Sequence, residues 1–511
     1  MFDKSGKAKA MFIVLLGLIF FAALVSCSAS QKIDKDEQKT DRINLNGTGF
    51  EKLDLPEDYD IREYEGTTLN FIVENNLYAN ILSHESEEFS DITGININIR
   101  AVDFDTLIQK INLDFIAHAG KYQLIYVDPY QTLNRFYNYL EVLNSYSRTP
   151  DRPHITGFPE DFIDFQTEVC SYFQKKDKIY TIPFDSTTMI LFYRKDIFAR
   201  YRARMIKELG YDPTPGSQDF TWERYCEVAE WINDKVPEAE VKYGSSIMAQ
   251  EHNSVFCEFS NLLAAYGGNY FLDKNISTLG TVDFQEINVQ DSDFIQALDM
   301  YKRVASVSAP EGLNWNWADA AAAFRNGEIA MMANWDENYT YLEDEELSKV
   351  AGKVGYAILP YGDAKSCNLY GGSGIGINKY ATETEKEAAW LYIVWATSKE
   401  MQLKVFQHAE GGSLPTRKSA YEEMNTAGRI SEEDTDKEAA VKDLSARDAF
   451  LKHKNAVLDA WKPENIYLRP KTSEFYNFEK VMTGRLHQML KDNLDSREVS
   501  NQIYQELMSP Q

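Results

Sequence analysis

The spacing of apolar residues changes repeatedly along the chain, and these changes predict alternating strands and helices. Thr68–Val73 forms a short apolar run, and Gly94–Val102 alternates apolar with polar residues, so both are expected to be strands, the second with one buried face. Tyr78–Phe89 and Asp105–Ala119 have helical spacing, and a buried strand then breaks at Pro129. This order predicts a largely parallel sheet with covering helices.

The later part of the chain contains the same mixture of elements. Lys178–Phe198 predicts two extended segments around Pro183. Thr221 is positioned to cap a helix, because its hydroxyl can accept a hydrogen bond from a free backbone N–H of the first turn. Further helices are expected from the capping box at Thr382–Glu385 onward, over 421–460 and over 473–508.

Residues 321–339 combine a helix, a glycine and a short apolar run. Gly327 suits the left-handed position just past a helix end, and Ile329–Ala333 predicts a short buried strand. Trp335 and Asp336 then stand side by side where that strand emerges. They can be ordinary packing, or one wall of a ligand cleft, because open α/β sheets bind ligands beyond the carboxyl ends of their strands.

Length, charge and missing motifs narrow the classes of function. A chain of 511 residues predicts two or three domains. Its formal charge, 53 − 79 = −26, argues against nucleic acid as a partner. We find no HExxH or GxSxG motif and no metal-binding spacing among the seven histidines, so we expect no enzyme, no cofactor and no metal. With 79 acidic residues, a carboxylate pair for glycoside hydrolysis is always available and decides nothing.

The N-terminus has the pattern of a secretory signal. Three lysines precede the apolar run Met11–Val25, which is short for a membrane span. Leu24–Cys27 resembles the bacterial lipobox, which implies a signal peptide over 1–26 and lipid attachment to Cys27; the alternative is an ordinary signal peptide with an incidental cysteine. The polar residues that follow, within 27–64, are expected to form a flexible tether.

Four cysteines remain if Cys27 carries lipid. An even number in an exported protein permits two disulfides with three possible pairings, whereas small buried thiols are the simpler interpretation, which we prefer. None of the four has the CxxC spacing of a metal cluster. They are Cys170, Cys226, Cys257 and Cys367.

Five stretches, in this order, resemble the extracellular solute-binding proteins of bacterial ABC importers, in particular the family-1, carbohydrate-type, maltose-binding-protein-like branch. The resemblance covers nearly all of the chain after residue 67. It departs from the family pattern at Asn334, where glycine is commoner before the tryptophan, and at Thr187, which stands near Asp185 where an acidic residue is usual. The five stretches are GKYQLIYVDPY, KIYTIPFDSTTMILFYRKDIF, DFTWERYCEVAEWI, AAFRNGEIAMMANW and the segment from KVGYAILPYG to ATSKEMQ.

The resemblance implies a two-lobed α/β periplasmic-binding-protein-like fold of type II with a hinge between the lobes. Lobe 1 would comprise 65–186 with 371–420, and lobe 2 would comprise 187–370 with 421–511. Trp335 would be a stacking platform in the cleft, because the C–H face of a sugar lies well on an aromatic ring while its hydroxyls need donors and acceptors.

Candidate ligand contacts lie at the expected strand ends, at the two lobe crossings and in a late aromatic segment. They are Glu74, Asn75, Asn76, Asp128, Tyr130, Asp185, Thr187, Trp335, Asp336, Gly371, Gly372, Ser373, Arg469 and Tyr476. Gly371 and Gly372 would let backbone amides approach the solute.

Several of these residues have a structural alternative. Glu74, Asn75 and Asn76 can cap the following helix, and Asp128 can be a turn residue. Trp315 and Trp317 can form a cleft rim or pack in the core. If Arg469 enters the cleft, an anionic ligand such as a uronic-acid sugar becomes a candidate.

The sequence therefore predicts an extracytoplasmic protein, lipid-anchored to a bacterial membrane at the cell surface or in the periplasm. A monomer is expected to capture a carbohydrate, favoured to be an oligosaccharide, and to deliver it to the transmembrane subunits of an ABC permease. The alternatives are a ligand-binding sensor and a binder of a non-sugar solute.

Overall fold

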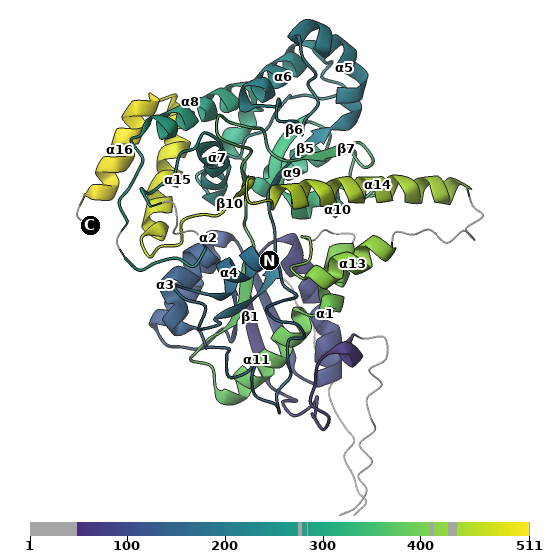
Figure 1. The fold of residues 1–511 in the computed structure, drawn as a ribbon, viewed down its shortest axis with the longest axis vertical. Helices are drawn as coiled ribbons and strands as arrows, with labels where there is room; N and C mark the ends of the chain where they lie inside the picture. The colour runs from purple at the N-terminus through teal and green to yellow at the C-terminus, as the bar shows by residue number, and fades with distance from the viewer. Residues whose placement is uncertain (1–48, 274–277, 284, 409–412, 428–436, 510–511) are drawn as a thin grey trace, which may run out of the picture. The chain divides into compact units, whose positions relative to one another are not determined.

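The structure, a computed structural model, describes residues 49–273, 278–283, 285–408, 413–427 and 437–509. Residues 45–511 form one compact unit. The predicted signal peptide and the predicted lipid site Cys27 lie outside the described residues. Two larger sheets, of five and three strands, organise the unit, and each has its own hydrophobic core (Figure 1).

The first sheet has five strands in the order β2-β1-β3-β9-β4. Strand β1 pairs in parallel with β2 and β3, whereas β9 runs antiparallel to both β3 and β4. The prediction of a largely parallel sheet therefore holds except for β9, which returns late in the chain. The strands are β1 (Thr68–Glu74), β2 (Asn96–Val102), β3 (Leu124–Val127), β4 (Thr181–Asp185) and β9 (Ser373–Ile377).

Helices cover this first sheet, which lies in the lower half of Figure 1. They are α1 (Leu77–Thr93), α2 (Phe104–Ile116), α3 (Asn134–Phe136), α4 (Asp164–Ser171), α11 (Glu383–Ala396), α12 (Lys399–Gln407) and α13 (Lys418–Ala427). The apolar faces of α1 and α11 meet in an aromatic core, where the rings of Phe89, Tyr392 and Trp395 pack together.

The segment predicted to be a flexible tether up to residue 64 is packed from Gly49 onward. Phe50 opens a short 3₁₀ turn, and its ring lies 5.8 Å from that of Phe89 and 6.4 Å from that of Trp395. Phe50 is 1% exposed. The tether prediction is therefore wrong for residues 49–64, because one buried aromatic side chain anchors a stretch that is otherwise polar.

The second sheet has three strands in the order β6-β5-β7, with β5 antiparallel to both neighbours. The strands are β5 (Met189–Arg194), β6 (Met331–Trp335) and β7 (Val354–Ala357). The helices of this half are α5 (Lys195–Leu209), α6 (Trp222–Lys235), α7 (Asn253–Ala265), α8 (Ser292–Val307), α9 (Trp317–Arg325), α10 (Tyr339–Glu343), α14 (Lys437–Ala460), α15 (Phe475–Asp492) and α16 (Ser496–Met508).

Two crossing segments that connect the sheets lie side by side. Thr188 and Tyr370 form an antiparallel bridge, and the Gly371 N–H donates to the Thr187 carbonyl at 2.9 Å. Just before the second crossing, β8 (Asn368–Leu369) pairs in parallel with β10 (Ile466–Tyr467) from the C-terminal part. The predicted lobe boundary at 420/421 falls inside α13, which packs against α12, whereas α14 packs against β7.

Several local predictions are confirmed by the backbone. The Thr221 side chain accepts from the Arg224 N–H, and Thr382 forms a capping box with Glu385. Gly327 has a φ of 82°, which is the left-handed conformation expected past a helix end.

Two strand predictions differ in detail from the structure. Strand β2 has no fully buried residue, because it lies at the sheet edge. Pro183 lies within β4 rather than between two strands, which is possible because β4 is the other edge strand and a proline there need not donate to a ladder. Among the described residues, no helix combines the length and the apolar character needed to cross a membrane.

Candidate functional site

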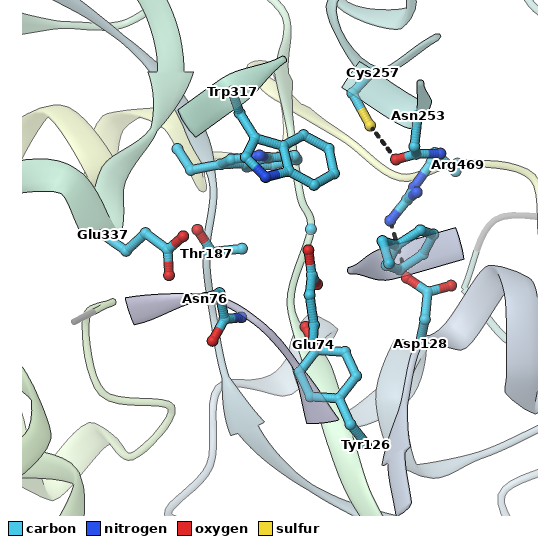
Figure 2. Close-up of a pocket in the computed structure, with 13 residues that line it drawn as sticks. Glu74, Asn76, Tyr126, Asp128, Thr187, Asn253, Cys257, Trp317, Glu337 and Arg469 are labelled. Atoms are coloured by element: carbon cyan, nitrogen blue, oxygen red, sulfur yellow. Dashed lines mark hydrogen bonds and ion pairs between the residues drawn. The ribbon is translucent and has the colours of Figure 1, made fainter. Parts of the chain in front are cut away.

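A small pocket collects side chains from both sheets at the level of the two crossing segments (Figure 2). Its cavity of about 30 Å³ leaves room for a few ordered waters, so the opposing walls lie close together. The residues that line it are Glu74, Asn76, Phe104, Tyr126, Asp128, Thr187, Asn253, Cys257, Trp317, Trp335, Glu337, Gly371 and Arg469.

Two tryptophans form the aromatic wall on the side of the second sheet. Trp335 is the last residue of β6, where pairing with Met189 at the start of β5 holds it beside the crossing segment. Trp317 opens α9, and the two ring centres lie 6.2 Å apart with planes at 70°. Trp335 and Trp317 both line the pocket, and the role of Trp335 in binding a solute stays a prediction.

Gly371 makes room for the indole of Trp335. A Cβ atom at this position would lie 2.7 and 2.8 Å from two atoms of the Trp335 ring and 3.2 Å from Thr187 Cγ2. The Gly371 N–H is already used by the Thr187 carbonyl. The absent side chain therefore accommodates an aromatic ring, rather than leaving a free amide for a solute as the sequence analysis expected.

Glu74 and Asn76 bring the end of β1 to the pocket from the side of the first sheet. The Asn76 side chain accepts from the Ala79 N–H and so caps α1, yet the residue also lines the pocket. The capping interpretation is therefore confirmed, and ligand contact by Asn76 stays a prediction. Glu74 ends β1 and remains partly exposed, because it opens into the pocket.

Asp128 and Arg469 form a buried ion pair along one side of the pocket. Asp128 Oδ1 accepts from the N–H groups of Tyr130 and Gln131, which makes it a turn residue. Its Oδ2 is 3.3 Å from Arg469 Nη2, and both side chains are 3% exposed. The Arg469 guanidinium also lies 4.3 Å from the centre of the Tyr130 ring. Arg469 therefore enters the pocket ion-paired through Nη2, while its Nε has no hydrogen-bond partner among the described residues.

Two further pocket side chains have buried polar atoms without a hydrogen-bond partner in the described part of the chain. Glu337 follows β6 in a short 3₁₀ turn and is 8% exposed, and its Oε2 is unpartnered. Thr187 is 7% exposed, and its Oγ1 is also unpartnered. Unsatisfied buried polar groups cost free energy, so a bound solute that supplies donors and acceptors would be stabilised here.

The carboxyl groups around the pocket hold protons more firmly than usual. Burial, followed by the nearby charges of Asp185 and Asp128, raises the pKa of Glu74 to about 8, although Arg469 acts in the opposite direction. Burial and the charges of Asp185, Glu74 and Asp336 raise the pKa of Glu337 well above its ordinary value. The pocket thus disfavours the negatively charged form of both carboxyl groups, so a proton or a cation is needed to balance them.

The structure brings together half of the predicted contact residues and leaves the others outside the pocket. Those that line it are Glu74, Asn76, Asp128, Thr187, Trp335, Gly371 and Arg469. Those that do not line it are Asn75, Tyr130, Asp185, Asp336, Gly372, Ser373 and Tyr476. Asp185 and Asp336 are fully buried and bind a crossing segment: Asp185 accepts from the Thr187 N–H at 3.2 Å and Asp336 from the Thr188 N–H at 2.6 Å.

Tyr476 lies in a second, adjoining pocket. This pocket has a volume of about 220 Å³ and shares Phe104 and Asn253 with the first one. Glu479 also lines it, and both carboxyl oxygens of this buried side chain lack a hydrogen-bond partner among the described residues.

Several pocket residues were not found by sequence reasoning. Asn253 and Cys257 are one turn apart on α7, where the Cys257 thiol donates to Asn253 Oδ1 at 3.0 Å. Glu337 directly follows the predicted Asp336, so its position after a strand was an available signal. Cys170, Cys226, Cys257 and Cys367 are all buried free thiols, as the simpler interpretation predicted.

Burial of Asp336 predicts a pH-dependent stability. Its pKa is raised to about 8 by burial and by Asp185, while burial lowers the pKa of His453, 3.7 Å away, to about 3, so His453 supplies no charge at neutral pH. In the unfolded chain the Asp336 carboxyl loses its proton near pH 4, whereas in the folded chain it keeps the proton to about pH 8. The free energy of unfolding therefore falls as the pH rises from about 4 to about 8.

We expect Asp336→Asn to flatten this decline by up to about 1.4 kcal/mol per pH unit in chemical unfolding of the unliganded protein between pH 5 and 8. Asp219→Asn, a change at an 88% exposed carboxylate, serves as the matched control and should leave the slope unaltered. An unchanged slope in Asp336→Asn would contradict the assignment.

The fold and the pocket together define a class of protein, in which two lobes hold one site between them. The chain belongs to the bacterial extracellular solute-binding protein family, whose model matches residues 83–403. No group of three or more metal-ligating side chains is found within the described residues.

Individual relatives are distant. The chain is 21% identical over 364 residues (71% of it and 75% of the relative) to a probable amino-acid ABC transporter periplasmic-binding protein of Sinorhizobium fredii. It is 23% identical over 335 residues (63% and 67%) to the mannitol-binding protein of Pseudomonas aeruginosa. An ABC transporter solute-binding protein of Agrobacterium radiobacter, solved with ribitol, has a similar fold with a TM-score of 0.67, 21% identity and coverage of 87% and 98%.

Proposed function

We propose that this protein captures a carbohydrate or polyol in the pocket between its lobes and delivers it to an ABC importer. The observation that carries the proposal is the combination of Trp335 and Trp317 with unpartnered polar atoms of Glu337 and Thr187 in one pocket. A sugar or polyol presents C–H groups to aromatic faces and hydroxyls to carboxylates and amides. The ribitol and mannitol ligands of two relatives support this substrate class.

Capture requires the lobes to open and then to close around the solute. The pocket is narrow, with a cavity of about 30 Å³ that leaves room for a few waters, so we expect its two walls to separate when a solute enters. Glu74 and Asn76 extend from the first lobe, whereas Trp335 and Glu337 extend from the second. A solute that contacts both walls stabilises the closed form, which is the form that a permease would recognise.

Delivery implies a place outside the cytoplasmic membrane. The family and two relatives described as ABC transporter components support an extracytoplasmic binding protein without enzymatic activity. The proposal also includes lipid attachment at Cys27, which the resemblance of Leu24–Cys27 to a lipobox supports, and a monomeric state.

A thermal-shift screen of the purified protein against sugars, polyols, amino acids and polyamines tests the proposal. A bound ligand raises the melting temperature by mass action. We expect a sugar or polyol to give a clear shift, and Trp335→Ala to weaken its binding by about 2–3 kcal/mol, the contribution of one buried aromatic face. Trp231→Ala, which removes an indole of the α6 core, should lower stability without removing the ligand-induced shift. A shift with amino acids or polyamines only would contradict the proposal.

A further inference from the structure

The charges that line the pocket do not balance. Its charged residues are Glu74, Asp128, Glu337 and Arg469, and Arg469 is paired with Asp128. No ion pair joins Glu74 or Glu337 to a cation within the described part of the chain. Two carboxyl groups therefore face the pocket without a positive partner, and the reason to expect an anionic ligand, a free Arg469, is absent.

The two uncompensated carboxyl groups come from opposite walls. Glu74 ends β1 of the first sheet, and Glu337 follows β6 of the second (Figure 2). They are close enough for the charge of Glu74 to raise the pKa of Glu337, and buried Asp185 and Asp336 add to this effect. Closing the lobes thus brings like charges together, which costs free energy unless a proton or a cation neutralises them.

Aromatic rings surround the same space. Trp317, Trp335, Phe104 and Tyr126 all line the pocket. Aromatic faces attract organic cations, most strongly when water is excluded, and an ammonium group between indoles and carboxylates is stabilised by both. A metal ion fits less well, since no cluster of three or more ligating side chains exists among the described residues.

We propose that the solute is an amino sugar or amino polyol, whose protonated amine binds between Glu74 and Glu337 while its hydroxyls occupy the rest of the pocket. This inference rests on the proposed function and narrows its substrate class. The protonated amine attracts the carboxyl groups on both walls, which otherwise repel each other. The positive charge of the ligand therefore favours the closed form of the two lobes. Thr187 Oγ1, unpartnered and buried, is available to a neighbouring hydroxyl.

The test is isothermal titration of the purified protein with matched compounds at pH 7. Each set contains an amine, its hydroxyl parent and its N-acetyl form: glucosamine, galactosamine and mannosamine with their parents, and 1-amino-1-deoxyglucitol with glucitol. We expect the amine of at least one set to bind at least tenfold more tightly than both neutral forms. Raising the salt concentration should weaken the amine more than the neutral forms.

Variants of the two carboxyl residues test which of them binds the amine of the ligand. Glu337→Gln should reduce the preference for the amine over its hydroxyl parent at least tenfold, because glutamine keeps a hydrogen-bonding side chain but removes the negative charge. Glu74→Gln provides the same test from the other wall if Glu337→Gln does not fold. Glu464→Gln, an exposed change of the same type in the second half of the chain, should leave the preference intact.

The outcomes separate this inference from the proposed function. Equal binding of amine, hydroxyl and N-acetyl forms overturns the inference and leaves carbohydrate capture in place. Tighter binding of uronates than of amines also overturns it. Failure of every sugar and polyol to bind, charged or neutral, contradicts the proposed function as well.

Discussion

Replacing Gly371 by alanine will weaken solute binding at least a hundredfold while the protein still folds. The new Cβ would lie 2.7 and 2.8 Å from ring atoms of Trp335, closer than real Cβ contacts, so the indole must move into the pocket or tilt away from it. Either displacement removes the flat face on which the solute is expected to lie. Titration calorimetry with the best ligand from the screen should show at least a hundredfold loss of affinity, about 2.7 kcal/mol.

A second glycine provides the control for this change. Gly484 lies inside α15, and a Cβ there would meet only Glu251 Oε1 at 3.7 Å, an ordinary contact. Gly484→Ala should keep full affinity and raise stability by roughly 0.5–1 kcal/mol, since alanine favours the helix. Normal binding by Gly371→Ala would show that the Trp335 position is not needed for capture.

Replacing either Asp128 or Arg469 alone will destabilise the protein strongly. Replacing both residues together will destabilise it much less. Asp128→Asn or Arg469→Met leaves one buried charge without its partner, which typically costs about 3–5 kcal/mol. Asparagine retains an acceptor for the Tyr130 and Gln131 N–H groups, so the turn itself is preserved. The double variant removes both charges and should recover most of the loss in a double-mutant cycle measured by urea unfolding.

A solvent-exposed ion pair provides the control for this substitution. Asp448 and Lys452 form an i,i+4 pair on α14, with side chains 56% and 54% exposed. Asp448→Asn should cost about 0.3–0.5 kcal/mol. If Asp128→Asn costs no more than this, the buried pair does not hold the C-terminal segment to the first lobe.

Elements with local causes were predictable from the sequence. The cap at Thr221, the capping box at Thr382 and the turn at Gly327 each depend on side chains or backbone angles within a few residues. The family resemblance supplied the two-lobed arrangement, and the family match confirms it. Predictions failed where distant packing decides the outcome, as for Phe50, whose aromatic partners lie far along the chain at Phe89 and Trp395.

The site was predictable to the extent that it lies at strand ends. Glu74, Thr187 and Trp335 all end or follow strands, and a sheet brings such positions to one edge. Asn253 and Cys257 lie on a helix that gives no such signal. Asp185 and Asp336 were predicted as ligand contacts but do not line the pocket. Their carboxylates accept hydrogen bonds from the backbone of the crossing segment instead.

The two tryptophans of the pocket also provide a fluorescence signal that should report whether a solute is bound. Trp317 and Trp335 face the same small space with ring centres 6.2 Å apart, and one of them touches the glycine of the crossing segment. Indole emission responds to the polarity around the ring, so exchanging a few waters for a solute changes the intrinsic fluorescence of the protein. Capture and release can therefore be timed in a stopped-flow instrument without attaching any dye.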